Sequence, residues 1–447
     1  MGFINLYSAI ILHAQTPDIV FEQLFLEQGL SQSIVQCICQ DRSGFMWFGT
    51  EDGLNKYDGY KFTIIRNDPD DPNSLSYNNI SAIFEDSAGI LWISTFYGGL
   101  NRYNPLTKRF HRYRHDPDNP HSISNDNVNA ILQDRQGNLW LGTDGGLNLL
   151  TAAELATIGT NINDSSLVFI RFQHDPTNPN SLSHDIVRSL YEDSSDVLWI
   201  GTDAGLNGLD PGSMDNENSE SALTFTHFSH DPKDPYSLSH DEVYSILEDR
   251  SGTLWIGTNN GGLNRFDRQR NRFIRFRHDP DDPQSLSHDA VYVIFEDSSG
   301  LLLLGTNGGG LCLFDRDKEQ FLTYINDPFD PSSISYNEIR AIYEDRSGLL
   351  WIGTYGGGVD KVDKSRRQFR LYRYDPRNSN SLNNPIVWSI HEDKQDILWI
   401  GTHGGGLNRF DRSRNEWRHY RHDPQNPGSL SHDIVRVVYE DKAGMIW

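Results

Sequence analysis

The sequence is poor in cysteine, in long hydrophobic runs and in positive charge. Its 447 residues include 3 cysteines, Cys37, Cys39 and Cys312. These are too few for a disulfide framework, and their odd number leaves at least one cysteine unpaired. The most apolar stretch, residues 3–14, is shorter than the roughly 18–20 residues that a membrane-spanning helix needs. With 39 basic against 62 acidic residues, the net charge of −23 repels phosphate backbones and anionic lipids. We therefore expect neither a nucleic-acid partner nor membrane insertion.

What the sequence does contain is a repeat with a period of about 48 residues. A tryptophan returns in the same local context in eight copies, and a leucine takes its place in one further copy. These positions are Trp47, Trp92, Trp140, Trp199, Trp255, Leu303, Trp351, Trp399 and Trp447. A period held through so many copies predicts an array of one small unit and excludes a two-domain enzyme fold.

Each unit holds four short runs rich in Val, Ile, Phe, Tyr and Trp, separated by clusters of Asp, Gly, Asn and Ser. In the fifth copy these runs are residues 243–249, 253–258, 262–267 and 273–279. Such runs are typical of strands joined by hairpins, and none shows helical periodicity. The first two runs are apolar on both faces and the fourth alternates apolar with basic residues, so we expect buried inner strands and a solvated outer strand. The fold class is therefore all-β, a β-propeller of four-stranded blades.

A second repeated element, of the form His-Asp-Pro-x-x-Pro-x-Ser-Leu-Ser-His-Asp, links one blade to the next. Its prolines and Asx side chains predict an ordered loop, and its central Leu is expected to be buried and to pin the loop down. The copies are residues 67–78, 115–126, 174–185, 230–241, 278–289, 326–337, 374–385 and 422–433.

The ends of the chain bear on ring closure and domains. Residues 21–26 match a fourth strand without inner strands of their own, and we expect them to complete the last blade of the ring. Closure on the seventh unit, 339–363, gives a propeller over 17–368 and leaves 369–447 as the start of a second, truncated propeller. The alternative is one eight-bladed ring that closes on 387–411. Because a ninth unit breaks off at Trp447, the chain resembles a fragment of a longer protein.

Residues 1–16 have the apolar core of a secretory signal peptide, although its basic n-region is missing. We interpret them as a remnant of a signal peptide, which favours a periplasmic or extracellular location; the alternative is a disordered leader. Two units are lengthened between their third and fourth strands, at 151–167 and 211–222, where insertions on a rim are tolerated.

The motif Glu-Asp-x-x-Gly-x-Leu-Trp-Ile-Gly-Thr-x-x-Gly-Gly-Leu-Asn-Arg-Phe-Asp, together with the linking loop, resembles the two-component regulator propeller repeat over roughly residues 19–447. In that family the repeats form the extracytoplasmic sensor region of hybrid two-component histidine kinases, commonly as two seven-bladed propellers before a β-sandwich, a membrane helix and the kinase. The resemblance therefore implies ligand sensing, often of carbohydrate breakdown products. This sequence lacks the sandwich, the helix and the kinase, so the resemblance covers the input end alone.

No residue pattern in the sequence indicates catalysis, a metal or a cofactor. Acidic pairs such as Glu192–Asp193 and Glu248–Asp249 recur in almost every unit, which favours a hairpin device over acid/base chemistry. Single histidines on separate blades do not converge as metal ligands do. Cys37 and Cys39 lie two apart on one strand and are interpreted as small core residues. We therefore predict no enzyme.

Function in a repeat protein is expected where the copies differ. The second residue of each inner strand varies strongly while its neighbours stay Val or Ile, and it lies near the mouth of the central channel. The copies read Gln36, Ser81, Asn129, Arg188, Tyr244, Tyr292, Arg340, Trp388 and Arg436. Arginine offers forked donors, and Tyr and Trp offer flat faces for sugar rings. The ligand-binding candidates are Arg188, Tyr244, Tyr292, Arg340 and Trp388; alternatively these side chains merely fill the wedge between blades.

Two functions follow from these patterns. The first is a sensor module for a small, saccharide-like ligand, with a downstream kinase segment in a longer protein or a second copy in a homodimer as partners. The second is a protein–protein interaction scaffold that presents its rim loops. A propeller lyase or glycosidase comes third, because no acid/base pair stands apart from the repeat.

Overall fold

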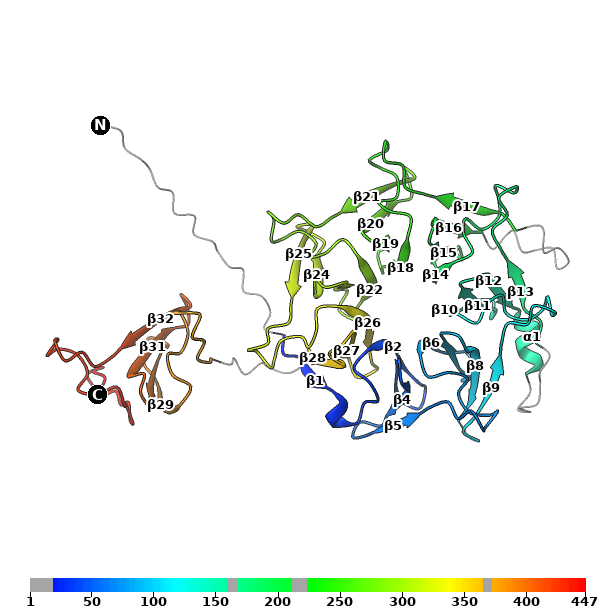
Figure 1. The fold of residues 1–447 in the computed structure, drawn as a ribbon. Helices are drawn as coiled ribbons and strands as arrows, with labels where there is room; N and C mark the ends of the chain where they lie inside the picture. The colour runs from blue at the N-terminus through cyan, green and yellow to red at the C-terminus, as the bar shows by residue number, and fades with distance from the viewer. Residues whose placement is uncertain (1–18, 106, 159–166, 211–222, 365–371) are drawn as a thin grey trace, which may run out of the picture. The chain divides into compact units, whose positions relative to one another are not determined.

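The computed structural model describes residues 19–105, 107–158, 167–210, 223–364 and 372–447 (Figure 1). The chain divides into two units, Met1–Arg366 and Arg367–Trp447, and each is described by itself. The residues interpreted as a signal peptide, 1–16, and the insertion at 211–222 lie outside the described residues. No helix in the described part of the chain has the length and apolar character needed to cross a membrane.

The described chain forms eight four-stranded antiparallel sheets, seven of them in the first unit, which confirms the all-β propeller. In chain order the blades of the first unit are β2 (Val35–Gln40), β3 (Met46–Thr50), β4 (Gly53–Tyr57), β5 (Phe62–Ile65); β6 (Ile80–Glu85), β7 (Leu91–Thr95), β8 (Gly99–Asn104), β9 (Arg109–Tyr113); β10 (Val128–Gln133), β11 (Leu139–Thr143), β12 (Gly146–Leu150), β13 (Ile170–Phe172); β14 (Val187–Glu192), β15 (Leu198–Thr202), β16 (Gly205–Leu209), β17 (Phe225–Phe228); β18 (Val243–Glu248), β19 (Leu254–Thr258), β20 (Gly262–Asp267), β21 (Arg272–Phe276); β22 (Val291–Glu296), β23 (Leu302–Thr306), β24 (Leu311–Asp315), β25 (Gln320–Tyr324); and β26 (Ile339–Glu344), β27 (Leu349–Thr354), β28 (Val359–Asp363) with β1 (Glu22–Leu24). The second unit holds β29 (Val387–Glu392), β30 (Ile397–Thr402), β31 (Leu407–Asp411) and β32 (Glu416–Tyr420). A helix α1 (Ala152–Thr157) lies within the first insertion, and a 3-10 turn η1 (Leu26–Gln28) follows β1.

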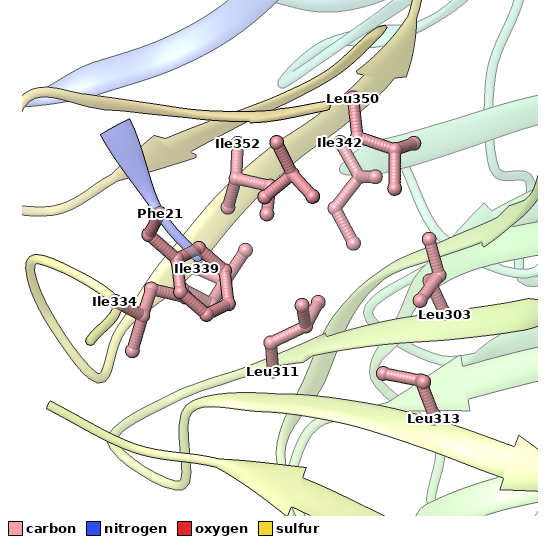
Figure 2. Close-up of a cluster of buried hydrophobic side chains, with 10 residues drawn as sticks. Phe21, Leu303, Leu311, Leu313, Ile334, Ile339, Ile342, Leu350 and Ile352 are labelled. Carbon is pink, nitrogen blue, oxygen red and sulfur yellow. The ribbon is translucent and has the colours of Figure 1, made fainter. Parts of the chain in front are cut away.

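The ring closes on the seventh blade. β1 pairs antiparallel with β28, with Leu24 opposite Val359, and the eight-bladed alternative is therefore wrong. Phe21, 3% exposed, packs beside Ile334 and Ile339 in the cluster between blades six and seven (Figure 2). The closing strand is shorter than the predicted 21–26, because the chain turns into η1 at Leu26. In Figure 1 the inner strands β2, β6, β10, β14, β18, β22 and β26 surround the centre of the ring.

The repeated tryptophan is a buried core residue in every blade of the first unit except blade six, where Leu303 replaces it at 1% exposure. In blade five Trp255 is 2% exposed, and its indole Nε1 donates to Asp249 Oδ2 over 2.8 Å. Oδ1 of the same Asp accepts from the amide of Thr253, which closes the hairpin. The acidic pairs of the repeat are thus confirmed as hairpin devices, in which the Asp closes the turn and, where the blade has a Trp, also anchors its indole.

We expected the inner strands to be buried on both faces, and the innermost strand of each blade is not. All five residues of a second strand such as β19 are buried, whereas β18 keeps four of its six residues partly exposed. The reason is geometric, since the inner strands surround the centre of the ring and no further strand pairs with them on that side (Figure 1). The outer strand also differs from the expected solvated edge: Arg275 of β21 donates from Nε and Nη2 to the carbonyls of Ser237 and Asp234 in the linking loop.

The linking loops are ordered and pinned as predicted. In the first unit their central apolar residue is fully buried, for example Leu75 and Leu238 at 0% exposure, whereas Leu430 of the last loop is half-buried. The histidine at the start of the loop turns back onto it, as His230 Nδ1 lies 2.8 Å from the carbonyl oxygen of Leu238. These histidines therefore have a local structural role.

The three cysteines are expected to be unreactive in the native protein. Burial raises the pKa of Cys39 to about 12 and raises those of Cys37 and Cys312 as well, so little thiolate forms at pH 8. We expect a thiol reagent such as 5,5′-dithiobis(2-nitrobenzoate) to label no cysteine of the folded chain within minutes. Unfolding in guanidinium should make all three reactive, and rapid labelling of the native protein would contradict the raised pKa values of the thiols.

Candidate functional site

The variable residue of each inner strand lies at a β-bulge. In β14 the register with β15 shifts between Val187 and Ser189, so Arg188 has no residue opposite it in the ladder. The same shift brackets Tyr244 in β18, Tyr292 in β22 and Arg340 in β26. A bulge re-aims the side chain of its extra residue and bends the strand, a device that is frequent beside functional sites. The variable position is thus the one point of the inner strand that is released from pairing.

Four of the five candidate residues are brought together, one from each of blades four to seven. The guanidinium carbon of Arg188 lies 5.8 Å from the ring centroid of Tyr244. The rings of Tyr244 and Tyr292 are 5.1 Å apart and inclined at 49°. The guanidinium of Arg340 lies 4.2 Å from the ring of Tyr292. We call Arg188, Tyr244, Tyr292 and Arg340 the mouth ladder.

Carboxylates fix both ends of the mouth ladder. Arg188 donates from Nε and Nη2 to the two oxygens of Asp203 over 2.7 and 2.9 Å, a bidentate pair. Burial disfavours the charged guanidinium, but the hydrogen bonds to Asp203 outweigh it and raise the pKa of Arg188. At the other end Arg340 pairs with Glu338 and also lies 4.8 Å from the ring of Tyr355.

The mouth ladder is half-buried and polar. The side chains of Arg188 and Arg340 are 28% and 25% exposed, and burial raises the pKa values of Tyr244 and Tyr292. At neutral pH both tyrosines therefore keep their hydroxyl protons and can donate hydrogen bonds. The arrangement offers ring faces, hydroxyls, guanidinium groups and carboxylates to a small ligand in one place.

Blades one to three present short polar residues at the same bulge. Asn129 donates from Nδ2 to Asp144 Oδ1 and to the carbonyl of Val187, both over 2.9 Å. Ser81 donates to the carbonyl of Val128. The large aromatic and basic side chains at this position are thus gathered in blades four to seven, whereas blades one to three carry Gln, Ser and Asn there.

The fifth candidate, Trp388, lies in the second unit and is not part of the mouth ladder. It is 41% exposed, its ring lies 4.9 Å from that of His403, and the guanidinium of Arg436 lies 4.9 Å from it. The same bulge occurs there, between Val387 and Ser389.

The partners of the mouth ladder were not among the residues that the sequence singled out. Asp203 and Tyr355 occupy the position directly after the Thr that ends each second strand, and this position varies as strongly as the inner-strand position. Its copies read Glu51, Phe96, Asp144, Asp203, Asn259, Asn307, Tyr355 and His403. Variation among the copies at this second position is the signal that could have found them. Within the described ranges no group of three or more His, Cys, Asp or Glu side chains could hold a metal ion.

Comparisons with known proteins agree with this architecture. The family model described as "Two component regulator propeller" matches seven stretches: 29–52, 74–97, 122–145, 181–204, 237–260, 333–356 and 381–404. The chain is 37% identical over 257 residues to a Formosa agariphila protein named Histidine kinase P4, an alignment that covers 58% of this chain and 17% of that protein.

Solved structures are similar over nearly the whole chain. The extracellular domain of a B. thetaiotaomicron protein described as a hybrid two-component system is 27% identical, with a TM-score of 0.75, over 96% of this chain and 52% of that one. The extracellular domain of a B. thetaiotaomicron protein described as a one-component system shares the fold at 23% identity and a TM-score of 0.58, over 96% of this chain and 51% of that one. This chain therefore spans about half the length of these solved relatives and about a sixth of the length of the curated one.

Proposed function

Because this chain is built from the repeats of the two-component regulator propeller family, we propose that it is the extracytoplasmic ligand-sensing part of a two-component signalling protein. The ligand is a saccharide or another small molecule, bound at the channel mouth on the mouth ladder. The kinase output lies in a segment that these 447 residues do not carry, in keeping with the much greater length of the related kinase.

The observation that carries the proposal is the convergence of four side chains from the variable inner-strand position, at four successive bulges. Residues that serve only the blade interface repeat from blade to blade, as Trp255 and Leu238 do. The position of the mouth ladder instead varies from blade to blade, from Gln36, Ser81 and Asn129 to Arg and Tyr, and its Arg and Tyr side chains contact one another across blades. Sugar rings stack on tyrosine faces, and their hydroxyls bond to guanidinium and carboxylate groups, so a saccharide matches this set of groups.

We also propose that the second unit begins a further propeller. On β29 the side chains of Val387 and Ile390 are 39% and 64% exposed. The matching residues of β18, Val243 and Ile246, are 0% and 8% exposed because the preceding blade covers them. Burial of this face of β29 against another blade would account for its apolar composition.

Replacing Tyr244 by alanine is expected to abolish ligand binding and to change stability little. The ring lies between Arg188 and Tyr292 and is half-buried, so its loss removes a stacking face and few core contacts. Thermal-shift screening of the wild type against a saccharide library would identify a stabilising sugar, and the variant should lose that shift.

Arg270→Ala is the matched control, because Arg270 pairs with Asp267 at a hairpin between outer strands and is 65% exposed. This control should bind like the wild type. If Tyr244→Ala lowers the free energy of unfolding by several kcal/mol while binding survives, the side chains of the mouth ladder only fill the space between blades. If no library member binds the wild type, the interaction scaffold is the better function.

A further inference from the structure

Blade two carries a strained tyrosine on the mouth face. Tyr97, in the turn between β7 and β8, has a φ of 68°, in the left-handed region that disfavours bulky side chains. At this turn position blade five has Asn260 and blade six has Gly308, residues that tolerate positive φ. Among the described residues outside glycine, Tyr97 alone combines positive φ with an aromatic side chain.

The strained residue does not contribute to the core. Tyr97 is 66% exposed, and its ring meets that of Tyr77 edge-to-face at a centroid distance of 6.0 Å. Tyr77, from the linking loop, is itself 45% exposed. The turn is pressed onto this loop, since a Cβ on Gly98 would lie 2.7 Å from the Cβ of Tyr77. The backbone strain at Tyr97 is not compensated by burial of its side chain. Such uncompensated strain points to a functional role.

A chain of contacts links this tyrosine pair to the mouth ladder. The backbone amide of Tyr97 donates to Asn127 Oδ1 over 2.8 Å, and Asn127 Nδ2 donates to Asp144 Oδ2 over 2.9 Å. Asn129 Nδ2 in turn donates to Asp144 Oδ1 and to the carbonyl of Val187, the residue before Arg188 of the ladder, both over 2.9 Å. Polar groups therefore run without interruption from blade two to blade four on the same end of the strands.

We propose that Tyr77 and Tyr97 form a second stacking subsite for a sugar ring, so that the ligand is an oligosaccharide that extends from blade two to the mouth ladder. This inference rests on the proposed function and adds the size class of the ligand. Two separate aromatic faces joined by amide and carboxylate groups match a chain of sugar rings better than a single ring.

The charges favour a neutral or amino sugar over a uronic acid. Both guanidinium groups of the ladder are already engaged, Arg188 with Asp203 and Arg340 with Glu338. Asp144 adds a further carboxylate, held by Asn127 and Asn129. A carboxylate on the ligand would meet this negative surface without a cation reserved for it.

The test compares the wild type with Tyr97→Asn, which places in blade two the residue that blade five already has. The probes are size series of neutral, amino and uronic oligosaccharides from one to six rings, titrated by calorimetry. We expect wild-type affinity for neutral or amino probes to rise between one and four rings, and Tyr97→Asn to lose about tenfold of the affinity for four rings while keeping that for one.

Strain gives an independent readout. Without a probe, Tyr97→Asn should melt about 1–3 °C higher than the wild type, because asparagine tolerates positive φ. Tyr60→Ala is the control: Tyr60 is 94% exposed, in the hairpin between β4 and β5 at the opposite end of the strands, and should change neither quantity.

The outcomes separate the two proposals. If four-ring probes bind Tyr97→Asn as tightly as the wild type while Tyr244→Ala loses them, the second subsite is overturned and the proposed function stands. A preference for one ring, or for uronic acids, also overturns this inference alone. If no probe binds the wild type, the proposed function fails and the inference fails with it.

Discussion

Replacing Asp360 by asparagine is expected to stabilise the propeller at pH 8 and to have almost no effect at pH 4. Asp360 is fully buried in β28, next to the closing strand β1, and burial raises its pKa to about 7. Other blades have asparagine here, for example Asn101 and Asn264. An asparagine accepts from the serine amide of the linking loop and donates to the opposite carbonyl, as Asn264 Nδ2 does to Ile256 over 3.3 Å. An ionised Asp360 accepts from Ser335 but cannot donate.

The direction of the pH dependence follows from proton linkage. An unfolded Asp has a pKa of about 3.9, whereas folded Asp360 has one of about 7. Between these values the folded state binds the extra proton, so the wild type loses stability as pH rises from about 4 to about 7. Below that window the carboxyl is protonated in both states and has no effect on stability. The shift of about 3 units sets an upper value of about 4 kcal/mol for the gain of Asp360→Asn at pH 8.

Urea denaturation of both proteins across pH 4–8 would measure this gain. The contributions of all other carboxylates cancel when the free energy of unfolding of the wild type is subtracted from that of the variant. Asn264→Asp is the matched control, since it moves the carboxylate into blade five. This control should be destabilised at pH 8 and recover toward pH 4. A difference between Asp360→Asn and the wild type that stays constant with pH would show that Asp360 does not titrate in this window.

The repeat explains why so much of the fold was predictable. Each blade must bury the same positions, so the burial of Trp255 and Leu238 follows from the pattern alone. The pattern also marks residues 21–26 as an outer strand without inner strands of its own, but it leaves open whether this strand closes on the seventh or the eighth unit. A departure from the pattern is also visible in sequence, as Asp360 stands where six other copies have asparagine and blade six has Cys312. The sequence does not show that Asp360 is buried, or that its ionised side chain lacks the hydrogen-bond donor needed there. Both depend on the packing of β28 between β1 and β27.

The candidate site was predictable only in part. Variation among copies pointed to Arg188 and Tyr244, but not to the bulge that releases them from pairing, because register is set by hydrogen bonds between strands. Nor did it reveal Tyr97, whose exceptional feature is a backbone angle and not a residue type. A tyrosine in a turn is ordinary in sequence and becomes informative only when its φ is known.

Truncating Trp255 to alanine is expected to cost about 3–5 kcal/mol of the free energy of unfolding. The indole lies between blades five and six, with its ring 5.3 Å from Phe314 and 6.0 Å from Phe276, so its removal leaves a cavity. The hydrogen bond to Asp249 is also lost, although Arg316 still donates to the same oxygen over 3.1 Å.

Two variants calibrate the effect of Trp255→Ala in urea denaturation at neutral pH. Trp255→Leu copies blade six, where Leu303 fills this position and Lys364 donates to the matching Asp297 over 2.7 Å; it should lose less than the alanine variant. Trp447→Ala removes a tryptophan that is 73% exposed and should change stability by no more than about 0.5 kcal/mol. If Trp255→Ala instead costs less than about 1 kcal/mol, the tryptophan is not the packing unit of the blade interface, because a cavity of that size in a close-packed core carries a larger penalty.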